Sequence, residues 1–182
     1  SRLKQATVSS HSHMEILEDL YLRLGDTKQQ VEDTQLQAEA LRLESEILED
    51  WGIEKYALAD YQGALFTTQL AIDVKKSSAV NDIEGIAKLQ CYQAECNLQI
   101  GNGGEAQRLL VEAHAAAERV GALKYKIESA LLLGKLLIGV QDERVIELYI
   151  EVLQDAHSIR DKLSEISALN GILHIASTKT DT

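Results

Sequence analysis

Apolar and small side chains recur along most of this chain at the spacing of an amphipathic α-helix. In residues 64–76 and again in residues 105–120, they fall three, four and seven residues apart, which gathers them on one helix face. The chain contains no proline, so no rigid residue interrupts these segments. The two stripes are Ala64, Leu65, Thr68, Ala71 and Ile72, and Leu109, Leu110, Ala113, Ala116, Ala117 and Val120. The pattern predicts an all-α protein.

Short polar turns separate the helical segments at a nearly regular interval. They begin at residues 25, 59, 101 and 139, so successive turns are 34, 42 and 38 residues apart. In three of them a glycine can take the left-handed conformation that ends a helix, and an Asp or Asn can cap the next helix. Repeats of this length are typical of stacked helical hairpins, each of which buries its apolar face against its neighbours.

The segment after the second turn resembles the tetratricopeptide-repeat family. Asp60 and Tyr61 are similar to that family's turn residue and aromatic, and Ala64 and Ala71 to its two small packing positions. Corresponding positions hold Gly101, Ala106 and Ala113 in the third hairpin, and Trp51-Gly52 and Leu133-Gly134 are similar to the family's Leu-Gly pair. The resemblance covers residues 14–176 and implies a right-handed α-α solenoid of about four hairpins plus a C-terminal helix.

The first and fourth hairpins depart from the family's pattern. Gln30 and Gln37 stand at the small positions of the first hairpin, and the larger Val145 and Val152 stand near those of the fourth. We therefore expect the fourth hairpin to pack more loosely or to be bent. The predicted segments are a flexible tail at 1–13, hairpins at about 14–45, 46–80, 83–121 and 125–160, a final helix at 163–176 and a polar tail at 177–182.

The charge of the chain excludes several classes of partner. The formal net charge is -11, and binding to nucleic acid or to an anionic membrane surface needs clustered Lys and Arg. The apolar runs are also too short to span a bilayer. Cys91 and Cys96 are five residues apart on different faces of one predicted helix, so they cannot form a disulfide with each other. Two reduced thiols favour an intracellular location, in the cytoplasm or the nucleus.

No motif in the sequence predicts catalysis or a cofactor. His11 and His13 lie with Glu15 in a Ser-rich segment typical of a disordered end, and the other histidines lack a second ligand three or four residues away. The glycine-rich segment 101–104 is not followed by the Lys-Ser/Thr of a phosphate-binding loop. We expect a protein that is not an enzyme and binds neither metal nor cofactor.

The sequence does predict a candidate binding groove. Residues 44–54 include five carboxylates and no Lys or Arg. In tetratricopeptide proteins the concave groove is lined by the first helix of each hairpin, and counting back from the turns gives the groove-facing positions. They are Glu46, Glu49, Ile53 and Tyr56 in the second hairpin, and Lys88, Cys91, Glu95 and Leu98 in the third. Carboxylates among apolar side chains suit a partner segment with Lys or Arg among apolar anchors.

Two functions remain open from the sequence. The first is an adaptor that binds a segment of another protein in this acidic and apolar groove. The second is a structural stretch of solenoid within a scaffold subunit of a large assembly, with self-association through the ends of the array. The final helix favours a further partner surface, because its apolar residues cover more than one narrow stripe. They are Ile166, Leu169, Ile172, Leu173 and Ile175.

Overall fold

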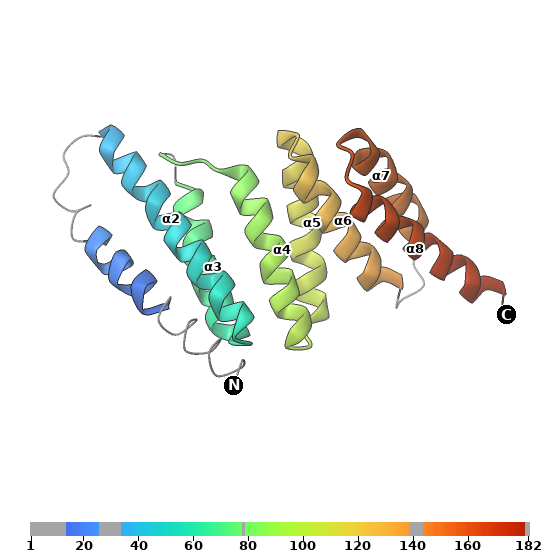
Figure 1. Cartoon of the computed structure of the whole chain (residues 1–182), viewed down its shortest axis with the longest axis horizontal. Coiled ribbons are helices and arrows are strands. Elements are labelled where there is room, and N and C mark those ends of the chain that lie inside the picture. The colour runs from blue at the N-terminus through green and yellow to red at the C-terminus, as the bar shows by residue number, and fades with distance from the viewer. Residues whose placement is uncertain (1–13, 26–33, 78, 139–143, 181–182) are drawn as a thin grey trace.

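The computed structural model describes residues 14–25, 34–77, 79–138 and 144–180, and every regular element among them is an α-helix (Figure 1). The all-α prediction is confirmed. A helix at residues 14–25 precedes seven further helices. These are α2 (Thr34–Ala57), α3 (Tyr61–Lys75), α4 (Ile83–Gln99), α5 (Gly103–Val120), α6 (Leu123–Ile138), α7 (Arg144–Ser158) and α8 (Lys162–Thr180).

The helices stack in consecutive antiparallel pairs to form a solenoid (Figure 1). The first helices of the pairs α2–α3, α4–α5 and α6–α7 are called A helices here, and the second are called B helices; α8 takes the next A position. Each A helix contacts the next A helix, whereas the B helices α3, α5 and α7 make no contact with one another among the described residues. The A side is therefore the more closely packed side of the array.

The structure corrects two of the predicted boundaries. The boundary between hairpins 14–45 and 46–80 falls inside α2, which is one continuous helix of 24 residues. Residues 34–50 contain neither glycine nor a turn motif, so nothing in that stretch ends the helix. At the other end, α8 continues to Thr180, past the predicted end at 176. The predicted tail at 1–13, Gln30 and the turn at 139–142 lie outside the described residues.

Asp side chains cap α3 and α4, the former at a turn that the sequence predicts. Asn102, in the third predicted turn, precedes α5 but forms no side-chain capping hydrogen bond. The amide of Gly63 donates to Asp60 Oδ1 at 2.9 Å at the start of α3. At the start of α4, the amide of Gly85 donates to Asp82 Oδ1 at 2.8 Å. Gly101 has the predicted left-handed conformation, with φ of 79°. In the turn between α2 and α3, Ala59 takes that conformation instead, with φ of 61°.

The predicted small positions lie at the centre of the helix pairs. Ala64, Ala71, Ala106 and Ala113 are each at most 1% exposed, which confirms the register of the repeats. Val145 and Val152 of the fourth pair are also 1% exposed, but α6 and α7 approach each other closely over less of their length than the helices of the other two pairs. The expectation of looser packing in the fourth pair is thus confirmed.

Glycines explain how the larger side chains of the fourth pair fit. The ring of Tyr149 in α7 lies between Gly134 of α6 and Gly171 of α8, and an added Cβ would lie 2.7 Å and 2.4 Å from it, respectively. Gly52 of α2 likewise allows α3 to approach closely, since a Cβ at Gly52 would lie 2.5 Å from Thr68 Cγ2. The two Gly positions similar to the Leu-Gly pair, Gly52 and Gly134, are therefore sites of close helix approach.

Candidate functional site: the A-helix face

The eight groove residues predicted from the sequence do not form one surface. Glu46 is exposed, Ile53, Tyr56, Lys88 and Glu95 are half-buried, and Leu98 packs against the main core. Cys91 is only 1% exposed, and burial raises the pKa of its thiol far above its ordinary range. Cys91 therefore belongs to the packing between helices and presents no atom to a partner.

Glu49 is engaged by two lysines inside the array. Its carboxylate contacts Lys88 of α4 and lies 3.4 Å from Lys75 Nζ of α3. Lys75, whose side chain is 6% exposed, also contacts Asp82 at 2.9 Å. Burial alone would lower the pKa of Lys88, but its contact with Glu49 outweighs that effect and raises the pKa. This buried network joins α2, α3 and α4, so Glu49 and Lys88 serve the fold.

Two other carboxylates on the A side lack such partners. Glu95 of α4 and Glu128 of α6 are half-buried, and neither forms an ion pair with a described residue. Burial raises the pKa of Glu95, and the charge of Glu128 raises it further, although Lys135 partly opposes the rise. Burial also raises the pKa of Glu128, although Lys124 and Lys88 partly oppose the rise. Successive A helices thus place two carboxylates, whose ionised forms are disfavoured, near each other on one face.

Three tyrosines surround these carboxylates. The ring centroid of Tyr56 lies 6.4 Å from that of Tyr92 in an edge-to-face arrangement, so α2 and α4 share an aromatic surface. Burial raises the pKa of Tyr56, Tyr92 and Tyr125, and the charge of Glu95 or Glu128 adds to the rise in each. We call the set Tyr56, Tyr92, Glu95, Tyr125 and Glu128 the A-face site. It combines half-buried aromatic surface with two carboxylates that form no ion pair among the described residues.

The sequence predicted only part of this site. Tyr56 and Glu95 were expected to face the groove, whereas Tyr92, Tyr125 and Glu128 were missed. On α4 the partly exposed face runs through Lys88, Tyr92 and Glu95. The prediction placed Cys91 between Lys88 and Glu95, but the residue on this face is Tyr92, and Cys91 is buried. The sequence could have indicated that Cys91 is buried, since free cysteine is among the most buried residue types.

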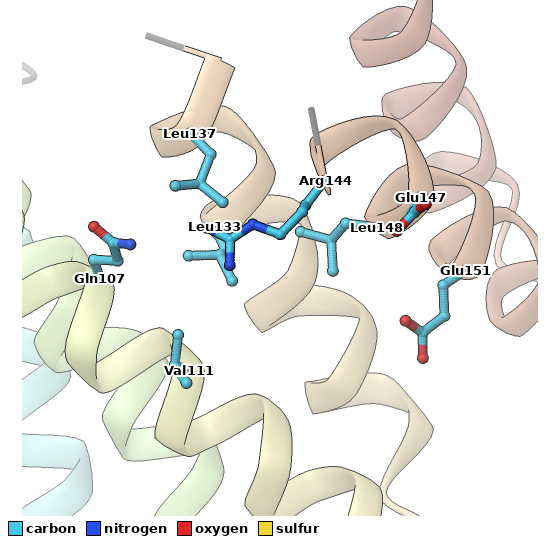
Figure 2. A pocket seen from close by; sticks show the side chains of 8 residues that line it. All are labelled: Gln107, Val111, Leu133, Leu137, Arg144, Glu147, Leu148 and Glu151. Atoms are coloured by element: carbon cyan, nitrogen blue, oxygen red, sulfur yellow. The ribbon is translucent and has the colours of Figure 1, made fainter. Parts of the chain in front are cut away.

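The B side holds an open cavity of about 320 Å³ where α5 and α7 stand apart over α6 (Figure 2). Leu133 and Leu137 form its floor, and both are less than 10% exposed. One rim residue, Glu151, is already paired with Lys126, which also contacts Asp155 at 2.9 Å and Glu118 at 3.7 Å. The cavity is lined by Gln107, Val111, Leu133, Leu137, Arg144, Glu147, Leu148 and Glu151. Its polar rim is thus partly engaged in holding α5, α6 and α7 together.

The histidines lie apart from one another. His114 Nδ1 is 3.2 Å from the carbonyl oxygen of Lys126, and His157 Nδ1 is 3.2 Å from Glu165. The described residues contain no group of three His, Cys, Asp or Glu side chains placed to hold a metal ion. His11 and His13 lie outside the described residues. No helix in the described part of the chain is long and apolar enough to cross a membrane.

No protein-family model matches the sequence, and no curated protein matches it either. Among solved structures, the fold is similar to the crystal structure of BtubC (BKLC) from P. vanneervenii, with a TM-score of 0.51 and 13% sequence identity. The alignment covers 100% of this chain and 94% of that one. At this identity the similarity concerns the fold alone.

Proposed function

We propose that this protein is a non-catalytic, intracellular interaction module of the tetratricopeptide type whose A-face site binds an extended segment of another protein. The half-buried pair Glu95 and Glu128 carries the proposal, because neither carboxylate forms an ion pair with a described residue and the nearby lysines offset the rise in their pKa values only in part. A Lys or Arg of the partner, placed between them, would remove their repulsion and gain two charge-assisted contacts. The preferred ligand is therefore a segment with a basic residue among apolar side chains.

The tyrosines define the neighbours of that basic residue. Tyr56 and Tyr92 present an aromatic surface next to Glu95, and Tyr125 lies near Glu128. Aromatic rings supply a large contact area at small conformational cost, and their faces also attract a cation. The ordered A helices hold these side chains in place before binding, which lowers the entropy lost on association.

Selection from a random 12-residue peptide library displayed on phage tests this proposal without assuming a partner. We expect the peptides enriched by the wild-type protein to carry Lys or Arg flanked by apolar residues. The synthetic peptide with the highest enrichment should lose at least tenfold in affinity, measured by fluorescence polarisation, for the double variant Glu95→Gln and Glu128→Gln. That loss corresponds to about 1.4 kcal/mol.

A matched variant separates the site from general charge effects. Glu147→Gln removes an exposed carboxylate from the B side and should leave affinity unchanged. Glu46→Gln tests whether the exposed carboxylate predicted from the sequence contributes as well. Peptides without basic residues, or equal binding to wild type and the double variant, would overturn the proposal. Glu49 is unsuitable for this purpose, because its loss would disturb the buried lysines.

A further inference from the structure

The A-face site repeats one side-chain pairing on two successive A helices. On α4, Tyr92 lies three residues before Glu95, and on α6, Tyr125 lies three residues before Glu128. Side chains three residues apart in a helix are neighbours on one face, so each carboxylate has a phenol ring beside it. All four residues are half-buried. A cation that enters this site therefore meets carboxylate oxygens and aromatic carbon together, and it loses part of its hydration.

The two pairings belong to one region of the A side. Burial raises the pKa of Glu95, Tyr92 and Tyr125, and the charge of Glu128 adds to the rise in each of them. At about 0.1 M salt, exposed charges more than about 10 Å apart are largely screened from each other. One charge that acts on all three groups therefore lies close to all three, and the four side chains border a shared region.

The ring of Tyr92 is the aromatic surface open to an incoming cation. Lys124 Nζ lies 5.3 Å from the ring centroid of Tyr125, so that ring already has a cation over it. The plane of Tyr92 is inclined by 76° to that of Tyr56, so the two rings form a corner rather than a flat stack. Burial and the charge of Glu95 raise the pKa of both tyrosines, which places this corner beside the Glu95 carboxylate.

These groups match a guanidinium better than an ammonium. The guanidinium of arginine is planar, stacks on aromatic rings and presents its N–H donors in a fork that suits carboxylates. It is also more weakly hydrated than the ammonium of lysine, so its transfer to a half-buried site costs less. A fully methylated lysine would find aromatic surface but has no N–H to donate, so it would leave Glu95 and Glu128 without a donor.

Lysines of this chain border the carboxylate pair. Burial raises the pKa of both carboxylates, but Lys135 partly opposes the rise for Glu95, and Lys124 and Lys88 partly oppose it for Glu128. Lys124 and Lys135 are exposed. A second basic residue next to the first would meet these like charges, and like charges across an interface disfavour the wrong partner. The surroundings thus favour one cation and oppose a run of them.

We propose that the A-face site selects a single arginine of its partner, in preference to lysine and to runs of basic residues. The guanidinium lies on the ring of Tyr92 and donates hydrogen bonds to Glu95 and Glu128. This assignment rests on the proposed function of the site. It narrows the ligand from basic segments in general to segments with one isolated arginine among apolar side chains.

Four forms of one peptide test this selectivity. The most enriched peptide of the phage selection is synthesised with Arg, Lys or citrulline at its basic position, and with Arg flanked by a Lys on each side. Fluorescence polarisation is measured at about 0.15 M salt, which screens the net charge of -11. The Arg form should bind about fivefold more tightly than the Lys form, because only Arg stacks and forks. The citrulline form, which has no charge, should bind least, and the flanked form should bind more weakly than the Arg form.

Variants of the protein show whether the selectivity arises at the named residues. Tyr92→Phe keeps the ring and should keep the ratio of the Arg and Lys affinities, whereas Tyr92→Leu should bring that ratio near one. A merely structural defect would lower both affinities together and leave their ratio unchanged. Lys135→Gln should reduce the discrimination against the flanked form. Lys76→Gln is its matched control, because it removes an exposed lysine that follows α3, and it should leave that discrimination unchanged.

The outcomes separate this inference from the proposed function. Equal binding of the Arg and Lys forms, tighter binding of the flanked form, or an unchanged ratio in Tyr92→Leu overturns the selectivity. In those cases the proposed function still stands if the double variant Glu95→Gln and Glu128→Gln weakens binding. If the citrulline form binds as tightly as the Arg form, or if no form depends on the two carboxylates, both the proposed function and this inference fail.

Discussion

The two halves of this solenoid are held together by different interactions. Between α4 and α8, the core is continuous and apolar, built from small residues and from Tyr149 between two glycines. Around α2 and α3, the apolar cluster centres on four buried residues, and the buried ion network of Glu49, Lys75 and Lys88 supplements it. One repeat geometry can thus be stabilised by close apolar packing or by paired charges, and the two halves should respond differently to substitution and pH.

The largest effect should come from the apolar half. Tyr149→Ala removes a side chain that is 1% exposed and leaves a cavity between α6, α7 and α8, so it should lower the free energy of unfolding by about 3–5 kcal/mol. Urea denaturation followed by circular dichroism measures this loss. Phe66→Ala removes a comparable ring from an exposed position and should change stability by no more than about 0.5 kcal/mol. Equal losses at the two positions would contradict the packing described.

In the charged half, removing one partner of the buried ion pair should destabilise the protein more than removing both partners. Glu49→Leu leaves Lys75 buried with Asp82 as its remaining partner, so its cost should be near the lower end of about 3–5 kcal/mol. Adding Lys75→Met replaces the buried pair with apolar groups and should restore most of the stability. Lys88 can then turn to water, because its side chain is 30% exposed. A double-mutant cycle in urea tests this, and purely additive losses would count against the network.

The turns of the two halves differ in backbone strain. Ala59 takes a left-handed conformation in the α2–α3 turn, which costs a residue with a Cβ about 1–2 kcal/mol, whereas Gly101 takes it freely in the α4–α5 turn. Ala59→Gly should relieve this strain and raise the free energy of unfolding by about 1 kcal/mol. The greater conformational entropy that glycine gives the unfolded chain offsets part of this gain. Gly101→Ala should lower it by about 1 kcal/mol, and an added Cβ there meets no neighbouring atom. Changes of the same sign in both turns would refute this account.

The smallest difference concerns pH. Burial would raise the pKa of Asp82, but the contact with Lys75 and the hydrogen bond from the amide of Gly85 lower it. The ionised Asp82 therefore stabilises the fold above the ordinary Asp pKa, and this stabilisation is lost as pH falls. Burial and the charge of Glu128 raise the pKa of Glu95, so ionising it weakens the fold, and that penalty fades as pH falls toward the ordinary Glu value. Glu95→Gln should therefore stabilise the protein at neutral pH. Its advantage should shrink toward pH 5 in thermal melts, and a constant advantage would contradict the raised pKa.

The repeat register was predictable because it depends on local chemistry. Asp60 can cap a helix only at its start, Gly101 tolerates a left-handed turn, and Ala106 and Ala113 allow close approach. The site was only partly predictable. Tyr56 and Glu95 were found by counting along helices. The lysines that contact Glu49, and the proximity of Glu128 to Glu95, depend on residues tens of positions away in the sequence.

The sequence by itself determined that the chain is helical, where most of its turns lie and which small residues meet in the helix pairs. These properties follow from backbone preferences and from side chains a few residues apart. Only the tertiary structure decided which carboxylates are paired and that residues 34–57 form one helix. Those outcomes depend on contacts between helices distant in sequence, where burial and charge act through space.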